Sequence, residues 1–251
     1  MSRSLRLKEV ALSLVAVAAA VSALTLDEAR WSGPEIAMAD FAYFAWPVVR
    51  IALIVAAVVV AIGHAREPHS LIVRPLTGTL LLLAAVQWLH PRGWPVLDTV
   101  LLVAAFAMIW RAYFQIHRHR ESMDWQTALG VELPLGLSAG WITLTISSAI
   151  AESIWSVADL REGTLAVAWQ SALLVVTLFF IGFGIEQTRA HPAYAVGALW
   201  GLIAIAVGAS TTEENTLMTV AIVVALITVA LFFIERAMFR YRARPQQPAD
   251  R

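Results

Sequence analysis

Long apolar runs separated by short polar segments are the main pattern along this chain. Each run approaches the ~20 residues that a helix needs to cross the hydrocarbon core of a bilayer. The breaks contain proline, glycine and charged residues, as in HPRGWP, REG, RAHP and STTEEN. The runs predict helices at residues 8–25, 42–63, 73–90, 95–116, 132–156, 165–186, 191–209 and 216–238. We therefore expect an all-α integral membrane protein with about eight transmembrane helices in a single domain over 1–251.

The first apolar run, at residues 8–25, has features of a signal peptide as well as of a membrane span. It follows a basic start and ends among small residues. We interpret it as a retained helix, because the later helices then alternate in register with the positive charges.

Lysine and arginine are distributed unevenly between the two sets of connecting segments. With the N-terminus inside, the inner segments hold 13 of these residues and the outer loops hold three, which are Arg30, Arg92 and Arg161. Because positive charge is retained on the cytoplasmic side, this bias predicts a plasma-membrane protein with both termini cytoplasmic. Residues 239–251 then form a basic cytoplasmic tail.

The composition supports a membrane protein and argues against several other classes. Of the 251 residues, 59% are hydrophobic and 14% are charged, whereas soluble domains average about 25% charged. The formal net charge is zero, so we expect the lipid bilayer and no nucleic acid as a partner. Cysteine is absent, which excludes disulfides and thiolate chemistry. No catalytic motif is present, and we predict no enzyme activity, no cofactor and no metal.

The segment at 132–156 has a polar stripe inside an apolar helix. Ser138, Trp141, Thr145, Ser148, Glu152 and Trp155 are spaced by three and four residues, so all six share one helix face. Lipid cannot satisfy such groups, and the stripe should face the interior of the bundle. Two interpretations remain open. Either the hydroxyls bond to carbonyls one turn earlier and the face packs another helix, or the stripe lines a cavity or polar path.

Arg50 lies about eight residues from the outer end of its predicted helix, which is roughly 12 Å deep. A charge at that depth costs about 2.5–3.5 kcal/mol on insertion scales and should have a partner. Asp98 and Glu152 are the acids at similar depth, so we expect Arg50 to pair with one or both.

Other polar residues receive simpler interpretations. Gln87 and His90 either join the outer polar cluster or, as we expect, reach the interface. Glu132 and Glu186 are also expected at the interface. The HRHR run at 117–120 is interpreted as a positive anchor rather than a metal site, because residues i and i+2 do not share a helix face.

The stretch LPLGLSAGWITLTISSAIAESIW resembles the fifth helix of the translocator protein / tryptophan-rich sensory protein (TspO/MBR-related) family. The segments at 41–62 and 81–106 are similar to the helix with FSIWGLIY and to the tryptophan–turn–helix segment of that family. The resemblance covers about 8–210 and implies a five-helix translocator-like core with extra flanking helices. It also implies binding of a tetrapyrrole- or sterol-like ligand, with cavity residues at Trp46, Trp88, Trp141 and Thr145.

Three functions follow from these patterns. The first is a sensory or regulatory membrane protein with a tryptophan-lined pocket for an apolar small molecule. The second is a proton-coupled or small-molecule carrier that uses Arg50, Asp98 and Glu152. The third is a ligand-free structural subunit, and a homodimer is a candidate assembly. The residues predicted to form the ligand site are Trp46, Arg50, Trp88, Asp98, Trp141, Thr145, Ser148 and Glu152.

Overall fold

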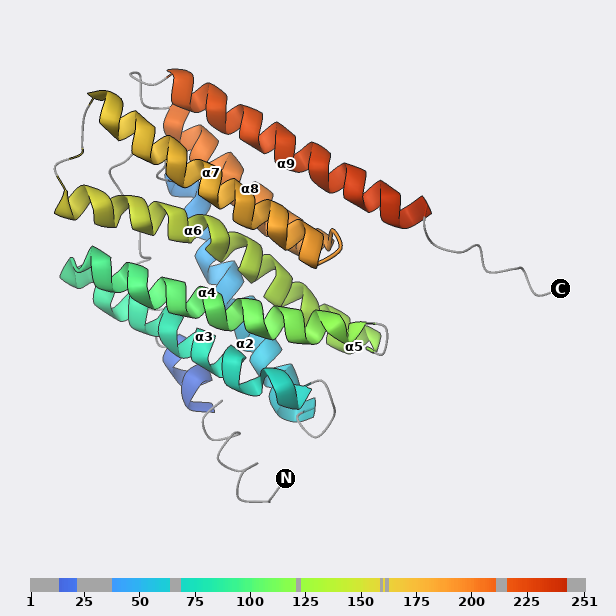
Figure 1. Ribbon diagram of the computed structural model, residues 1–251. Coiled ribbons are helices and arrows are strands. Elements are labelled where there is room, and N and C mark those ends of the chain that lie inside the picture. Colours follow the sequence, from blue (N-terminus) through green and yellow to red (C-terminus); the bar gives the residue numbers. More distant parts are fainter. Residues whose placement is uncertain are drawn as a thin grey trace.

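The computed structural model describes residues 14–21, 38–63, 69–120, 123–158, 160, 163–210 and 216–242. Within these ranges the chain is helical and contains no strand (Figure 1). The long helices are α2 (Ala45–Gly63), α3 (His69–Leu89), α4 (Pro95–Arg118), α6 (Leu133–Val157), α7 (Gly163–Gln187), α8 (Pro192–Ser210) and α9 (Thr216–Arg242). The short elements are η1 (Asp40–Phe44), η2 (His90–Arg92), α5 (Trp125–Thr127) and η4 (Ala128–Glu132).

Seven of the helices in the described ranges are long and apolar enough to cross a membrane. Together with the absence of strands there, this establishes an all-α membrane protein. Residues 14–21 are helical as well, but the rest of the first predicted span, 8–25, lies outside the described residues.

Three helices extend beyond the predicted spans. The helix predicted from 73 begins at His69 and contains Pro75, whose carbonyl accepts the Thr79 hydroxyl. The helical stretch of α6 begins at Trp125, where Asp124 caps the chain by accepting from the Thr127 amide. It then passes through one π-helical turn, η4, before α6. Finally, α9 continues to Arg242, so residues 239–242 of the predicted tail are helical, and 243–251 lie outside the described residues.

Consecutive helices run in opposite directions, which gives the bundle two ends (Figure 1). The C-terminal ends of α2, α4, α7 and α9 lie at one side, which we call the His117 end. The C-terminal ends of α3, α6 and α8 lie at the other side, which we call the His90 end.

The centre of the bundle is α6, which packs against α2, α4, α7 and α8 (Figure 1). In its membrane-spanning stretch 78% of the residues are buried, compared with 17% in α9. The sequence predicts one interior face for this helix, but both faces are covered, because its Leu, Ile and Ala positions pack on other helices instead of lipid.

The backbones of α6 and α8 approach each other closely. A Cβ atom on Gly140 would overlap the backbone of α8 at Tyr194 and Ala198, and one on Gly197 would overlap the backbone of α6 at Leu137. Small residues permit such contact between membrane helices. The crossing therefore fixes the position of α8 against α6.

Candidate functional site

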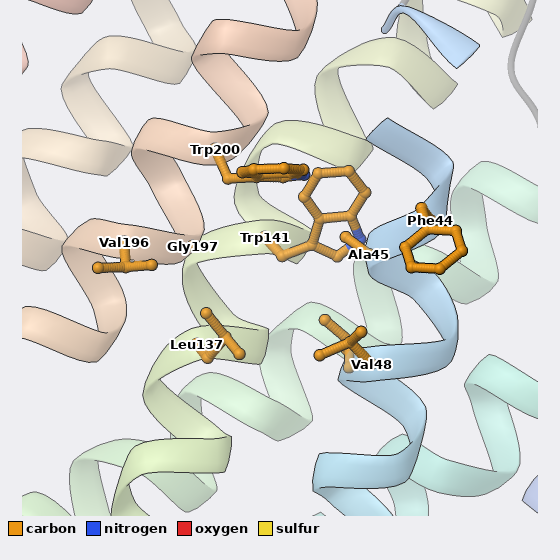
Figure 2. Close-up of a pocket in the computed structure, with 9 residues that line it drawn as sticks. Phe44, Ala45, Val48, Leu137, Trp141, Val196, Gly197 and Trp200 are labelled. Atoms are coloured by element: carbon orange, nitrogen blue, oxygen red, sulfur yellow. The ribbon is translucent and has the colours of Figure 1, made fainter. Parts of the chain in front are cut away.

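An apolar pocket lies where α2, α6 and α8 meet (Figure 2). Its volume is about 260 Å³. Trp141 is 1% exposed and forms the inner wall, whereas Phe44, Val48, Val196 and Trp200 are exposed at the rim. Because Val48, Val196 and Trp200 lie on membrane-spanning helices, the pocket opens sideways toward lipid. We call it the tryptophan pocket, and its lining residues are Phe44, Ala45, Val48, Val49, Leu137, Trp141, Val196, Gly197 and Trp200.

Two side chains of α2 pack in sequence against Trp141 on the side away from the pocket. Trp46 is 3% exposed and meets Trp141 edge to face, with 6.1 Å between the ring centroids. The guanidinium of Arg50 lies 5.6 Å from the centre of the Trp46 ring, within the range of a cation–π contact. The indole N–H of Trp141 has no hydrogen-bond acceptor in the structure. Trp46 thus supports the pocket wall but does not line the pocket.

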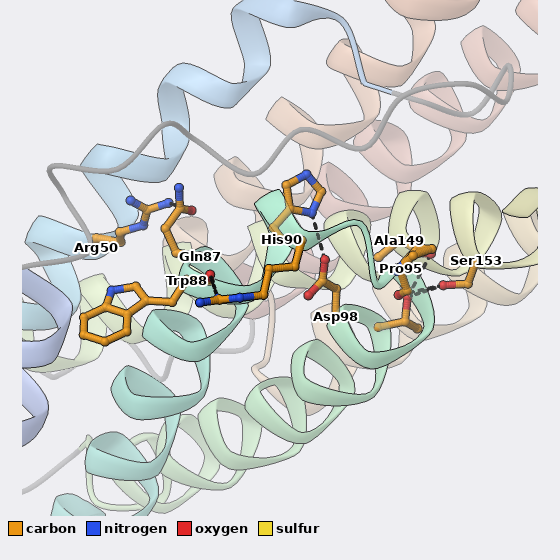
Figure 3. A network of polar contacts seen from close by, with 10 residues as sticks. Arg50, Gln87, Trp88, His90, Pro95, Asp98, Ala149 and Ser153 are labelled. Atoms are coloured by element: carbon orange, nitrogen blue, oxygen red, sulfur yellow. Dashed lines mark hydrogen bonds and ion pairs between the residues drawn. The ribbon is translucent and has the colours of Figure 1, made fainter.

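Arg50 is buried, as its depth predicts, but its partner differs from the prediction (Figure 3). Its Nη2 donates to Oε1 of Gln87 at 2.6 Å. Among the described residues no ion pair joins Arg50 to Asp98 or Glu152. Oδ2 of Asp98 instead lies 2.8 Å from Nδ1 of His90, and Oδ1 has no hydrogen-bond partner. Arg50 therefore donates to the amide oxygen of Gln87 and to neither of the two predicted carboxylates.

Gln87 and His90 thus belong to the polar cluster at the His90 end. Gln87 is 1% exposed. Glu152 is half-buried, and its Oε2 has no hydrogen-bond partner. Thr99 of α4 donates to the Ala149 carbonyl of α6 at 2.8 Å, which ties the two helices together beside this cluster (Figure 3).

The remaining predicted site residues lie away from the tryptophan pocket. Thr145 is fully buried and donates to the Trp141 carbonyl at 3.0 Å, which is the helix-packing interpretation of the stripe. Ser148 is 1% exposed and also lies in the core. Trp88 is 52% exposed at the end of α3 and does not line this pocket. Of the eight predicted residues, Trp141 is the one that lines it.

A second polar cluster, at the His117 end, was not predicted. Glu132 lies at the end of the bundle, but its side chain is 1% exposed and covered by protein. Its Oε1 lies 2.8 Å from Nδ1 of His117 and 3.5 Å from Nε2 of His191, and its Oε2 lies 3.6 Å from Nε of Arg120. The turn that carries His191 includes Arg189 and Ala190, both with positive φ.

This cluster also changes the interpretation of the HRHR run. His117 and Arg120 both turn toward Glu132, so the run does more than anchor the chain. Across the described ranges, no group of three or more His, Cys, Asp or Glu side chains has a geometry that could hold a metal ion. Sequence spacing gave no signal for the cluster, since its three segments are far apart along the chain.

The fold and the pocket together define a class: a multi-pass α-helical membrane protein with a tryptophan-walled pocket open to lipid. The family model described as TSPO-like protein matches residues 10–234. The chain therefore belongs to the TSPO-like protein family. The match includes α7, α8 and most of α9, which the sequence analysis regarded as additions to a five-helix core. No curated protein and no solved structure matches the chain.

Proposed function

We propose that this protein binds an apolar, ring-containing small molecule in the tryptophan pocket and has a sensory or regulatory role without catalytic turnover. The observation that carries the proposal is the pocket itself. It is an apolar space of about 260 Å³ between three membrane helices, with Trp141 at its wall and Trp200 at its rim. Ligand sites are usually concave, apolar and rich in aromatic side chains.

The chemistry of the lining favours a sterol-like ligand over a tetrapyrrole. Apart from the two indole N–H groups, every lining side chain is hydrocarbon or absent. The acid groups of a tetrapyrrole would find no cation there, because Arg50 lies behind Trp46 and Trp141. The volume is slightly below the ~300–1,000 Å³ of typical sites. Part of the ligand would therefore remain in the bilayer.

A sensory role is supported by the contacts that connect the tryptophan pocket to the polar cluster at the His90 end. Its walls come from three helices, and Trp141 contacts Trp46, which in turn contacts Arg50 in the polar cluster. A ligand that displaced the Trp141 ring would also displace Trp46. Ligand binding would then alter the contacts between α2 and α3, which Arg50 and Gln87 connect.

The test is a titration in lipid nanodiscs with two probes, dehydroergosterol and protoporphyrin IX, monitored by energy transfer or quenching of tryptophan fluorescence. We expect saturable binding, stronger for the sterol. Trp200→Ala should weaken it by up to about tenfold, since an aromatic contact contributes ~0.5–1.5 kcal/mol.

Trp88→Ala is the matched control, because Trp88 is similarly exposed but does not line the pocket. Absence of saturable binding of either probe to a folded protein would overturn the proposal. Co-purification with a fixed partner in that case would favour a structural subunit, and light scattering would show whether the protein forms a homodimer.

The carrier function has one observation in its favour. Asp98 is 1% exposed, and one of its oxygens has no hydrogen-bond partner; the same holds for Oε2 of Glu152. Buried acids of this kind occur on proton and ion paths. A carrier would move protons or solute across liposomes and lose that flux in Glu152→Gln with the fold intact.

We also propose one transmembrane domain in the plasma membrane, with the His117 end and both termini cytoplasmic. The positive-inside rule supports this orientation. Because the chain has no cysteine, single cysteines can be introduced at Ser4 and at Arg161 and labelled with an impermeant maleimide on intact cells. We expect labelling at position 161 and none at position 4.

A further inference from the structure

A second pocket lies on the other side of α6, between α4, α6 and α7, and has a volume of about 190 Å³. It shares no lining residue with the tryptophan pocket. Leu137 and Trp141 face the tryptophan pocket, while Thr143 and Ser147 face this one, in agreement with the ~100° rotation per helical residue. We call it the hydroxyl pocket.

Two hydroxyls in this pocket lie near the middle of the membrane. Ser147 and Thr177 are each well inside their helices, roughly 15–20 Å from either end. The hydrocarbon core is about 30 Å thick, so both groups lie near its midplane. Val176 and Phe180, at the edge of the pocket, are 51% and 42% exposed, and the pocket thus opens to lipid.

The protons of these hydroxyls are all engaged in hydrogen bonds within the protein, whereas oxygen lone pairs remain available to a ligand. Thr177 donates to the Leu173 carbonyl at 2.8 Å, and Thr143 donates to the Ala139 carbonyl at 2.7 Å. The oxygens of Ser147 and Thr177 are 2.5 Å apart, and either can be the donor. Ser147 also donates to the Thr143 carbonyl at 3.4 Å, so its proton has an acceptor within the bundle in both arrangements. A hydroxyl has one proton and two lone pairs. The Ser147 oxygen can therefore accept a hydrogen bond but has no proton to offer.

The walls of the pocket suit a flat ring. Phe106 of α4 and Phe180 of α7 meet edge to face, with 6.2 Å between the ring centroids. Ile146, Ile150 and Leu173 supply the remaining apolar surface. The volume is smaller than most ligand sites, so one ring would fill it, and an attached tail would extend into lipid.

We propose that the hydroxyl pocket binds the head group of a lipid-soluble quinol, whose phenolic O–H donates to Ser147. Sterols and phospholipids hold their polar groups at the interface, whereas this pocket presents its acceptor at mid-membrane. The corresponding quinone carries only carbonyl acceptors, and it would meet a hydroxyl pair without a free proton. The pocket therefore distinguishes the reduced from the oxidised form of one molecule. This site is independent of the function proposed above.

The experiment compares decylubiquinol with decylubiquinone, each titrated into the full chain in nanodiscs under anaerobic conditions, with binding measured by microscale thermophoresis. We expect saturable binding of the quinol, and binding of the quinone weaker by about tenfold, the effect of one hydrogen bond to a buried group. Ser147→Ala should remove the difference between the two forms. Its fold should survive, because the Thr177 proton remains on Leu173.

Two further variants separate this site from the rest of the protein. Val176→Phe fills the pocket from its exposed rim and should abolish quinol binding. Trp88→Ala, at an exposed position that lines neither pocket, should leave the preference unchanged. Equal affinity for quinol and quinone, no binding of either, or a preference that persists in folded Ser147→Ala would each overturn the proposal.

Discussion

Oε1 of Glu132 lies 2.8 Å from Nδ1 of His117, which joins the turn before α6 to the end of α4. The same oxygen faces His191, at the start of α8. One buried carboxylate thus connects the ends of three helices, two of which, α6 and α8, form walls of the tryptophan pocket.

Replacing Glu132 with Ala should destabilise the bundle strongly. The change would leave two imidazoles and Arg120 around an empty position, and removing one partner of a buried ionic cluster costs about 3–5 kcal/mol. Arg120 is 40% exposed and can turn to water, so we expect the lower part of that range. The measurement is unfolding by SDS in mixed micelles.

Glu186→Ala provides the comparison for that measurement. Glu186 pairs with Arg236 at 3.0 Å, but its side chain is 52% exposed. Exposed pairs contribute about 0–1 kcal/mol. If the two substitutions had equal effects, the cluster around Glu132 would not connect the helices as described.

Gly197→Ala should separate α6 from α8. A Cβ atom at position 197 would overlap the Leu137 carbonyl, and only a backbone shift can relieve that contact. Overpacking typically costs about 1–3 kcal/mol. We expect a lower melting temperature and weaker sterol binding together.

Gly182→Ala tests whether the effect is specific to the crossing. A Cβ atom on Gly182 would meet nothing within 4 Å. Alanine in a helix interior is favoured over glycine by about 1 kcal/mol, so this variant should be as stable as the parent or more so. A loss of stability comparable to that of Gly197→Ala would contradict the packing argument.

Arg50 and Gln87 should be energetically coupled. Hydrogen bonds to charged groups contribute about 1.5–3 kcal/mol. A double-mutant cycle with Arg50→Met and Gln87→Leu should give a coupling energy in that range, measured by thermal unfolding. The same cycle with Arg50→Met and Asp98→Asn should give a smaller value, because Asp98 is bonded to His90.

Filling the tryptophan pocket should block the ligand without loss of stability. Val196 is 56% exposed at the rim, so Val196→Phe places a ring in the pocket but adds nothing to the core. We expect sterol binding to fall about tenfold or more, because the new ring occupies space that the ligand needs. Val207→Phe, on the same helix but outside the pocket, should bind normally.

The sequence predicts the helices well and their partners poorly. Hydropathy locates a span such as Pro95–Arg118 because crossing a bilayer requires a continuous apolar run. It also places Arg50 in the interior. It does not show which neighbour Arg50 meets, because that depends on the rotation of α2 and α3 about their axes.

The Glu132 cluster was missed for a related reason. Residues 117, 132 and 191 belong to different segments, and each alone is typical of a helix end at the interface. The π-helical turn before α6 has no periodic signal either. Trp141, in contrast, lies on a regular stripe, and for that reason its inward direction could be predicted while the wall that it forms could not.

The position of α9 has a consequence for biogenesis. This helix packs mainly on α7 and α8, and 17% of its membrane-spanning stretch is buried. Both pockets are formed by α2, α4, α6, α7 and α8, all of which leave the ribosome before α9 does. The part of the bundle that forms the two pockets can therefore assemble while the last helix is still being synthesised, and α9 then covers α7 and α8 as an outer layer.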